Sequence, residues 1–306
     1  MTQLLPLNAI ENPPSFRNAV INGDCRVAQR GNVAVSTNTT QYGGADRIYF
    51  FSSGFTTISG ILSQISGSAT TSGYAQSITL ATTGTGQVQF GTRIESRDTR
   101  RFNSKTVTLS LKLYQDTGSS QVVQLALHRP TSVADNFITL TQLGISAGLV
   151  IPNATWTSVD LTVALGAADA NNGLQLSAYY SSMGAMTSKI FAIGDITLEQ
   201  GAVVSAFESR PYGVELALCQ RFYEVGTYSV TIYNSGAGTS LPAAGIAFKV
   251  PKIFNAGIGF SSVTYANCSA LAQRGSVTAT FCPLAMNVTA AGLATADFTY
   301  VATVEL

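Results

Sequence analysis

Acidic residues with arginine neighbours are the first feature of the sequence that could do chemistry. Pairs of carboxyl groups cleave glycosidic bonds, one of them as a proton donor. Glu95 and Asp98 lie in the segment RIESRDTRR (93–101), which also carries four arginines. Cationic neighbours favour the ionised form of a carboxyl group, whereas a general acid must hold its proton. We therefore predict a salt-bridged strand end here and assign no catalytic residue.

The same arginines, together with Lys105, allow a second interpretation. Guanidinium groups match the geometry of carboxylates and phosphates, so this segment could bind an anionic sugar or a phosphate. Because Glu95 and Asp98 lie among these cations, they weaken the positive field. We therefore favour the salt-bridged strand end over an anion site.

The only histidine, His128, lies in LALHRP (125–130), and no GxSxG motif is present. We interpret His128 as a strand-end residue satisfied by backbone or solvent. A single histidine excludes a multi-histidine metal site, and no compact run of Asp, Asn and Glu has calcium-ligand spacing. We expect no metal, no cofactor and no enzyme activity, with a glycan-degrading tailspike-like enzyme as the remote alternative.

Tyrosines supply the surface chemistry that we favour. Sugar rings pack against flat aromatic side chains, and their hydroxyls form hydrogen bonds with Asn, Asp and Gln. Tyr74, Tyr179 and Tyr180 are the candidate sugar-binding residues. Neighbours on a strand point to opposite faces, so one residue of the adjacent pair should lie in the core and the other outside. Trp156 is expected to pack in the core.

The composition indicates which elements must position these residues. The chain has 306 residues, 28 glycines, 11% charged residues and a formal net charge of +1. Short alternating runs, such as Val107 to Leu113, predict strands with one buried face. The small net charge argues against nucleic-acid binding. No apolar stretch is long enough for membrane insertion, and no signal peptide begins the chain, so we expect synthesis in the host cytoplasm.

The predicted fold class is all-β: an antiparallel jelly-roll sandwich, then a short helix and a small C-terminal β-domain. We expect an N-terminal anchoring arm at 1–18, the sandwich at 19–212, a linker helix at 213–224 and the terminal domain at 225–306. Terminal-domain strands are expected at 228–233, 246–250, 261–265, 276–281 and 298–306. The arm contains three prolines and apolar residues without local packing partners. These anchoring residues are Leu4, Leu5, Leu7 and Phe16.

The linker helix has two apolar stripes, which must be covered either by the domains or by copies of the chain. We expect a homotrimer in which the terminal β-domain takes part. The predicted interface residues are Val214, Leu218, Phe222, Ile246, Phe248, Tyr300 and Val304. Close to this helix, Glu208 and Arg210 are expected to pair. The four cysteines have no metal-site spacing; we expect free thiols, with Cys219 and Cys282 buried.

Six segments, taken in order, carry a family resemblance. They are NAVINGDCRVAQRG (18–31), ADRIYF (45–50), GTRIESRDTRRFNSKTVTLSLKLY (91–114), TWTSVDLTV (155–163), ITLEQGAVVSAFESRPYGVELALCQRFYE (196–224) and GIAFKVPKIFNAGI (245–258). With these segments the chain resembles phage tail-fibre and other virion surface proteins with a carbohydrate-binding-module-like jelly roll. Ile48 departs from the resemblance, because similar proteins commonly have tryptophan there. This change either weakens a packing contact or removes an aromatic platform.

The resemblance implies a trimeric, non-enzymatic virion component exposed to the host surface. The predicted function is a tail fibre that contacts a host surface glycan and is held by its arm on other virion proteins. The alternative is a capsid decoration, cement or head-fibre protein. We favour the phage tail over the capsid surface because the junction at 196–224 and the final β-domain are typical of fibres.

Overall fold

The computed structural model describes residues 17–306. Its contacts divide the chain into two compact units, one extending to Glu215 and including Leu306, the other comprising Leu216–Glu305. The boundary therefore falls within the junction helix, a few residues after the expected end of the sandwich at 212. The predicted anchoring residues Leu4, Leu5, Leu7 and Phe16 lie outside the described residues.

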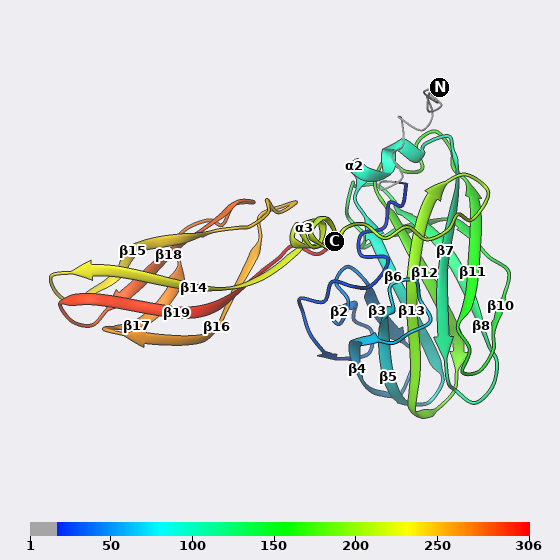
Figure 1. Cartoon of the computed structure of the whole chain (residues 1–306), viewed down its shortest axis with the longest axis horizontal. Coiled ribbons are helices and arrows are strands. Elements are labelled where there is room, and N and C mark those ends of the chain that lie inside the picture. Colours follow the sequence, from blue (N-terminus) through cyan, green and yellow to red (C-terminus); the bar gives the residue numbers. More distant parts are fainter. Residues whose placement is uncertain (1–16) are drawn as a thin grey trace, which may run out of the picture. The chain divides into compact units, whose positions relative to one another are not determined.

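The first unit is a sandwich of two antiparallel sheets (Figure 1). The first sheet contains, in spatial order, β1 (Val33–Ala34), β4 (Thr57–Ser66), β5 (Tyr74–Thr83), β13 (Met186–Gln200), β7 (Thr106–Gln115) and β11 (Thr157–Ala164). The second sheet contains β10 (Leu149–Ile151), β8 (Gln121–Pro130), β12 (Leu174–Met183), β6 (Gly86–Ile94), β3 (Tyr49–Ser53) and β2 (Gln41–Tyr42), with β9 (Leu140–Ile145) paired to β8. The predicted jelly-roll fold class is confirmed.

Alternation of side chains explains how these strands form one core. On β7, Val107, Leu109 and Leu113 are buried inside the sandwich, whereas the polar residues between them face outward. Leu176 on β12 belongs to the same core from the opposite sheet. Ile48 is also fully buried in this core. The departure from the resemblance at Ile48 therefore concerns a packing contact in the core rather than an exposed aromatic platform.

The junction helix α3 spans Tyr212–Gln220. It follows Pro211, whose carbonyl accepts hydrogen bonds from the amides of Val214 and Glu215. Strand β14 (Tyr223–Asn234) already begins at Tyr223, so the expected helix at 213–224 starts and ends earlier than predicted. Two shorter helical turns, α2 (Ser96–Thr99) and η2 (Arg100–Phe102), connect β6 to β7.

The second unit contains two three-stranded antiparallel sheets. One is ordered β14, β19 (Gly292–Thr303), β16 (Gly257–Ala266), and the other β15 (Gly238–Ala247), β18 (Phe281–Val288), β17 (Cys268–Gln273). Both sheets contribute to a common core. The expected strand at 276–281 is wrong, because the amide of Thr278 bonds to the carbonyl of Phe281 in a turn and β18 starts only there.

Four of the predicted interface residues are buried within the chain itself. Phe222, Ile246, Phe248 and Tyr300 are at most 9% exposed, and the last three belong to the core of the second unit. Their assignment to a trimer interface is wrong, because the chain itself already covers them. Val214 is 42% exposed, and Leu218 and Val304 are half-buried, so these three stay predictions.

A buried ionic network lies in the second unit. The Lys252 ammonium is 2.6 Å from a carboxylate oxygen of Glu224, and both side chains are 0% exposed. Tyr300 donates its hydroxyl hydrogen to the other oxygen of Glu224 at 2.6 Å, and the amide of Lys249 also donates to this carboxylate. Lys252 further donates to the carbonyls of Gln220 and Val250. Each charge in the network therefore has hydrogen-bond partners.

All four cysteines are buried and carry free thiols. The expected burial of Cys219 and Cys282 is confirmed, since both are 0% exposed. Burial raises the pKa of the thiols of Cys25, Cys268 and Cys282.

Candidate functional site

The outward face of the second sheet carries a row of aromatic and amide side chains across four neighbouring strands. Phe51 on β3 is opposite Gln89 on β6, Gln89 is opposite Tyr179 on β12, and Tyr179 is opposite Gln124 on β8. Because strands in a sheet lie about 4.8 Å apart, the row extends over roughly 14 Å. We call these four residues the cross-strand row. Phe51, Tyr179 and Gln124 are half-buried, and Gln89 is 7% exposed.

A hydrogen-bond network fixes the amide in the middle of this row. Gln89 donates through Nε2 to the Tyr49 hydroxyl at 2.7 Å and to the Ser177 hydroxyl at 3.0 Å. The two hydroxyls lie 3.1 Å apart and are hydrogen-bonded. A Cβ atom at Gly91 would lie 2.4 Å from the Tyr49 ring, so glycine is needed for the ring to cross β6. With Nε2 held in this way, the carbonyl oxygen of Gln89 has a defined direction.

A second polar rung lies beside the row. Arg93 donates from Nε to Oε1 of Gln175 at 2.9 Å. The Arg93 guanidinium also lies over the rings of Tyr49 and Phe137, at 5.3 and 5.2 Å from their centroids. Gln175 is the register partner of both Arg93 and His128. Arg93 and Gln175 therefore hold each other in place next to the aromatic residues, and His128 adds one imidazole.

His128 positions the edge of Tyr179. The two rings are 6.2 Å apart and meet edge to face at 77°. Burial lowers the pKa of His128 below its ordinary value, so the imidazole is neutral at pH 7. Within the described residues, the buried Nδ1 has no hydrogen-bond partner. The interpretation of His128 as a residue satisfied by backbone or solvent stays a prediction.

The predicted sugar-binding tyrosines do not come together. Tyr179 lies in the cross-strand row, whereas Tyr180 is fully buried in the core against Phe191, with ring centroids 5.1 Å apart. Tyr180 offers no face to a sugar, as expected for one residue of an adjacent pair. Tyr74 begins β5 in the other sheet and is 38% exposed. Phe51 in YFFSS belongs to the row but was missed by the sequence analysis.

The other missed residues are Gln89 and Gln124. Both come from strands in which polar and apolar residues alternate, GQVQFGTRI in β6 and QVVQLALHRP in β8. This alternation places the glutamines on an outward face but does not say which strands are neighbours. The order of β8, β12, β6 and β3 depends on pairings between distant segments, such as Tyr49 with Gly91.

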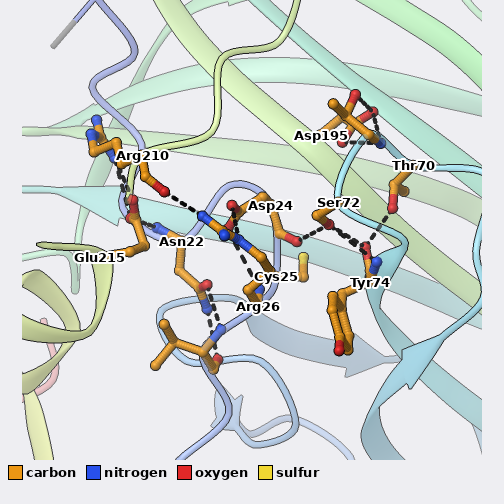
Figure 2. Close-up of polar contacts among 12 residues, drawn as sticks. Asn22, Asp24, Cys25, Arg26, Thr70, Ser72, Tyr74, Asp195, Arg210 and Glu215 are labelled. Atoms are coloured by element: carbon orange, nitrogen blue, oxygen red, sulfur yellow. Dashed lines mark hydrogen bonds and ion pairs between the residues drawn. The ribbon is translucent and has the colours of Figure 1, made fainter. Parts of the chain in front are cut away.

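A different polar cluster joins three of the six segments that carried the resemblance, 18–31, 45–50 and 196–224 (Figure 2). Asn22 donates its backbone hydrogen to Glu215 in α3, and its Nδ2 donates to the carbonyls of Val27 and Asp46 at 2.8 Å each. The amide of Val27 returns a hydrogen bond to Oδ1 of Asn22 at 2.9 Å. Asn22 is 0% exposed, so the cluster forms the interior of the unit.

Arg210 and Glu215 form the ionic centre of this cluster. Their side chains lie 3.1 Å apart and are at most 8% exposed. Arg210 also donates to the carbonyls of Asn18 and Val20. Its own carbonyl accepts from Arg26 (Figure 2). The predicted pair of Glu208 with Arg210 is wrong, because Arg210 faces the buried Glu215. Glu208 pairs instead with Arg17, 3.3 Å away.

The same close-up includes Tyr74 and explains its place (Figure 2). Its amide donates to the Ser72 hydroxyl at 3.1 Å, and its carbonyl accepts from the Thr70 hydroxyl at 2.7 Å. Asp195 holds the same loop by accepting from Thr71. These contacts hold the loop through the backbone of Tyr74, and its strand belongs to the other sheet, apart from the cross-strand row.

The acidic residues of the arginine-rich segment are ion-paired. Arg97 lies 3.1 Å from Glu95 and 3.6 Å from Asp98. This bears out the salt bridges expected there, although Glu95 precedes the helical turn α2 and Asp98 lies in it, rather than on a strand.

Among residues 17–306, no cluster of three or more His, Cys, Asp or Glu is suited to a metal ion. No helix in the same range is both long and apolar enough to cross a membrane.

Trp156 lies outside the core, contrary to the expectation. It is half-buried, and its ring packs against Tyr114 with centroids 5.5 Å apart and a tilt of 38°. Tyr114 alternates with the buried Leu113 on β7, so the pair lies on the outward face of the first sheet.

Comparison with known proteins gives fold-level similarities only. No protein-family profile and no curated protein sequence matches the chain. The CBM22-2 xylan-binding domain from Paenibacillus barcinonensis Xyn10C is 14% identical, with a TM-score of 0.33 over 46% of this chain and 88% of that domain. The family 11 carbohydrate-binding module from Clostridium thermocellum, solved with a mixed-linked tetrasaccharide, is 13% identical, with a TM-score of 0.35 over 58% of this chain and 100% of that module.

A phage protein is also among the similar structures. It is the enzymatically active domain of tailspike protein 4 of bacteriophage CBA120, which is 11% identical with a TM-score of 0.35. The match covers 60% of this chain and 22% of the tailspike chain. At these identities and TM-scores, the likenesses transfer no function to this chain.

Proposed function

We propose that this protein binds a glycan on the outward face of the second sheet and does so as a virion surface protein of the tail-fibre kind. The observation that supports glycan binding is the cross-strand row, in which two aromatic rings alternate with two amides. Aromatic faces pack against the apolar faces of sugar rings, while amides exchange hydrogen bonds with hydroxyls. The row provides both kinds of contact along one line.

The surroundings of the row prepare it for a neutral glycan. Gln89 is held by Tyr49 and Ser177, so its amide needs no reordering when a sugar hydroxyl arrives. No acidic residue belongs to the row, and Arg93 beside it is already bonded to Gln175. Without a carboxylate pair in the row, the chemistry is recognition of hydroxyls rather than cleavage of the glycosidic bond.

Substitution of the central aromatic tests this proposal. We expect Tyr179→Ala to weaken retention of the full-length protein on a glycan array by about tenfold to a hundredfold, equivalent to about 1.4–2.8 kcal/mol. The ring packing against the sugar is lost, while the half-buried position limits the effect on folding. Tyr74→Ala is the matched control, because Tyr74 is also partly exposed but lies in the other sheet. Equal retention of both variants would refute the site.

Placement on the virion is supported by the six segments that resemble tail-fibre proteins. We propose a homotrimer that is held by its N-terminal arm on other virion proteins. Gold-labelled antibody against residues 225–306 is expected to mark the tail of intact virions in electron micrographs. Label spread over the head would contradict the fibre and favour a decoration protein.

Light scattering of the full-length protein tests the trimer, which a monomer mass at micromolar concentration would exclude.

A further inference from the structure

The outward face of the first sheet contains a second group of aromatic and polar residues. On β7 and β11, Lys112 is opposite Ser158, and Ser110 is opposite Asp160. Leu111 and Val159, which alternate with them, are buried in the core, so these four polar residues share the outer surface. The sheet therefore presents donors and acceptors on the side of the sandwich opposite to the cross-strand row.

A cavity of about 230 Å³ opens over these residues. Its lining includes Ser110, Lys112 and Asp160, together with Phe207 from the segment after β13. The Lys112 ammonium lies 3.1 Å from Asp195, which fixes its position at the cavity wall. Pockets for drug-sized ligands measure roughly 300–1,000 Å³, so a cavity of this size suits a single sugar ring.

The aromatic pair of Tyr114 and Trp156 lies next to this cavity. Tyr114 follows Lys112 by two residues on β7, and Trp156 precedes Ser158 by two residues. Same-face neighbours along a strand are separated by roughly 7 Å, so the pair occupies the adjacent rung. Both rings are half-buried, which leaves part of their surface open. Tyr114 therefore places the aromatic pair one same-face step along β7 from Lys112, which lines the cavity.

From this juxtaposition we infer a second carbohydrate site on the first sheet, which takes one neutral sugar residue. The Tyr114 and Trp156 rings contact the apolar face of the sugar. Asp160, which is exposed, accepts hydrogen bonds from sugar hydroxyls, and Lys112 donates to them. This inference rests on the proposed function, since it assigns a further part of a glycan to a separate surface of the same unit.

Two sites on opposite sheets would give the protein bivalent attachment. A glycan coat offers many copies of the same sugar, so binding at one sheet raises the effective concentration of sugar at the other. The two sites would thus strengthen attachment without any additional contact at the cross-strand row.

Trp156 supplies a direct measurement, because it is the only tryptophan in the chain. Its fluorescence in the full-length protein is titrated with glucose, galactose and N-acetylglucosamine as separate probes. We expect a saturable change with at least one sugar, unaltered in Tyr179→Ala and weakened about tenfold or more in Tyr114→Ala and Asp160→Asn. Tyr233→Ala is the matched control, because Tyr233 is 78% exposed and lies in the second unit.

The outcomes separate this site from the cross-strand row. If no sugar changes the fluorescence while glycan-array retention still depends on Tyr179, the second site is refuted and the proposed function stands. If Tyr179→Ala abolishes the change but Tyr114→Ala and Asp160→Asn do not, the signal comes from the row and the second site is again refuted. If the change depends on Tyr114 and Asp160 while retention is insensitive to Tyr179, the second site stands and the row is refuted.

Discussion

Lys252→Met is expected to lower the free energy of unfolding of the second unit by about 3–5 kcal/mol, because removal of one partner leaves the other charge buried without compensation. The uncompensated group is Glu224, whose side chain is 0% exposed. Urea unfolding of the full-length protein, followed by circular dichroism, measures the change. The exposed neighbour Lys249 gives the control, since Lys249→Met should stay within about 0.5 kcal/mol.

Acidification should weaken the same network. Burial alone raises the pKa of Glu224, but hydrogen bonds from Lys252, Tyr300 and Lys249 outweigh it and hold the pKa below its ordinary value of 4.5. A lowered carboxyl pKa means that the stabilisation is present above pH 4.5 and is lost as the pH falls further. The double variant Lys252→Met with Glu224→Leu should regain much of the stability that Lys252→Met alone loses, since no charge then remains buried. A double variant as unstable as Lys252→Met would contradict the explanation by an uncompensated buried charge.

Arg210→Met is the second change with a large expected effect, again about 3–5 kcal/mol, but in the first unit. It removes the partner of Glu215 (Figure 2) and the donors to the carbonyls of Asn18 and Val20. For a unit of this size, each kcal/mol shifts the melting temperature by about 2–4 °C, so we expect a fall of roughly 10 °C in thermal unfolding.

Arg17→Met is the matched control for this second prediction. Arg17 also pairs with a glutamate, Glu208, but its side chain is 43% exposed. Exposed ion pairs contribute about 0–1 kcal/mol, so the control should change the melting temperature by only a few degrees. If both arginine variants melted at the same temperature, burial of the Arg210 network would not be the source of the stability.

The sequence predicted strands where one face is buried and neighbours alternate. Val107 to Leu113 became β7, and the alternation also separated Tyr179 from Tyr180 correctly. Closeness in sequence predicted the wrong partner for Glu208. It pairs with Arg17, far away in the sequence, rather than with Arg210 two residues away. The tertiary fold, rather than closeness in sequence, determines which charged residues pair.

The candidate site was only partly predictable for the same reason. Tyr179 was identified because it is aromatic, but its partners Phe51, Gln89 and Gln124 come from three other strands. A one-residue shift in any of those pairings would turn the polar side chains inward. Register therefore decides the composition of the row, and it depends on pairings between residues that lie 38 to 90 positions apart in the sequence.

The burial of all four thiols limits the reactivity of this protein toward thiol reagents and oxidants. Thiolates are the reactive species, and burial keeps Cys25, Cys268 and Cys282 in their protonated form. Maleimide reagents and mild oxidants therefore have no accessible native target among the cysteines while the chain is folded. A single cysteine introduced at an exposed position such as Ser181 would accept a dye or a cross-linker alone, with all native cysteines retained.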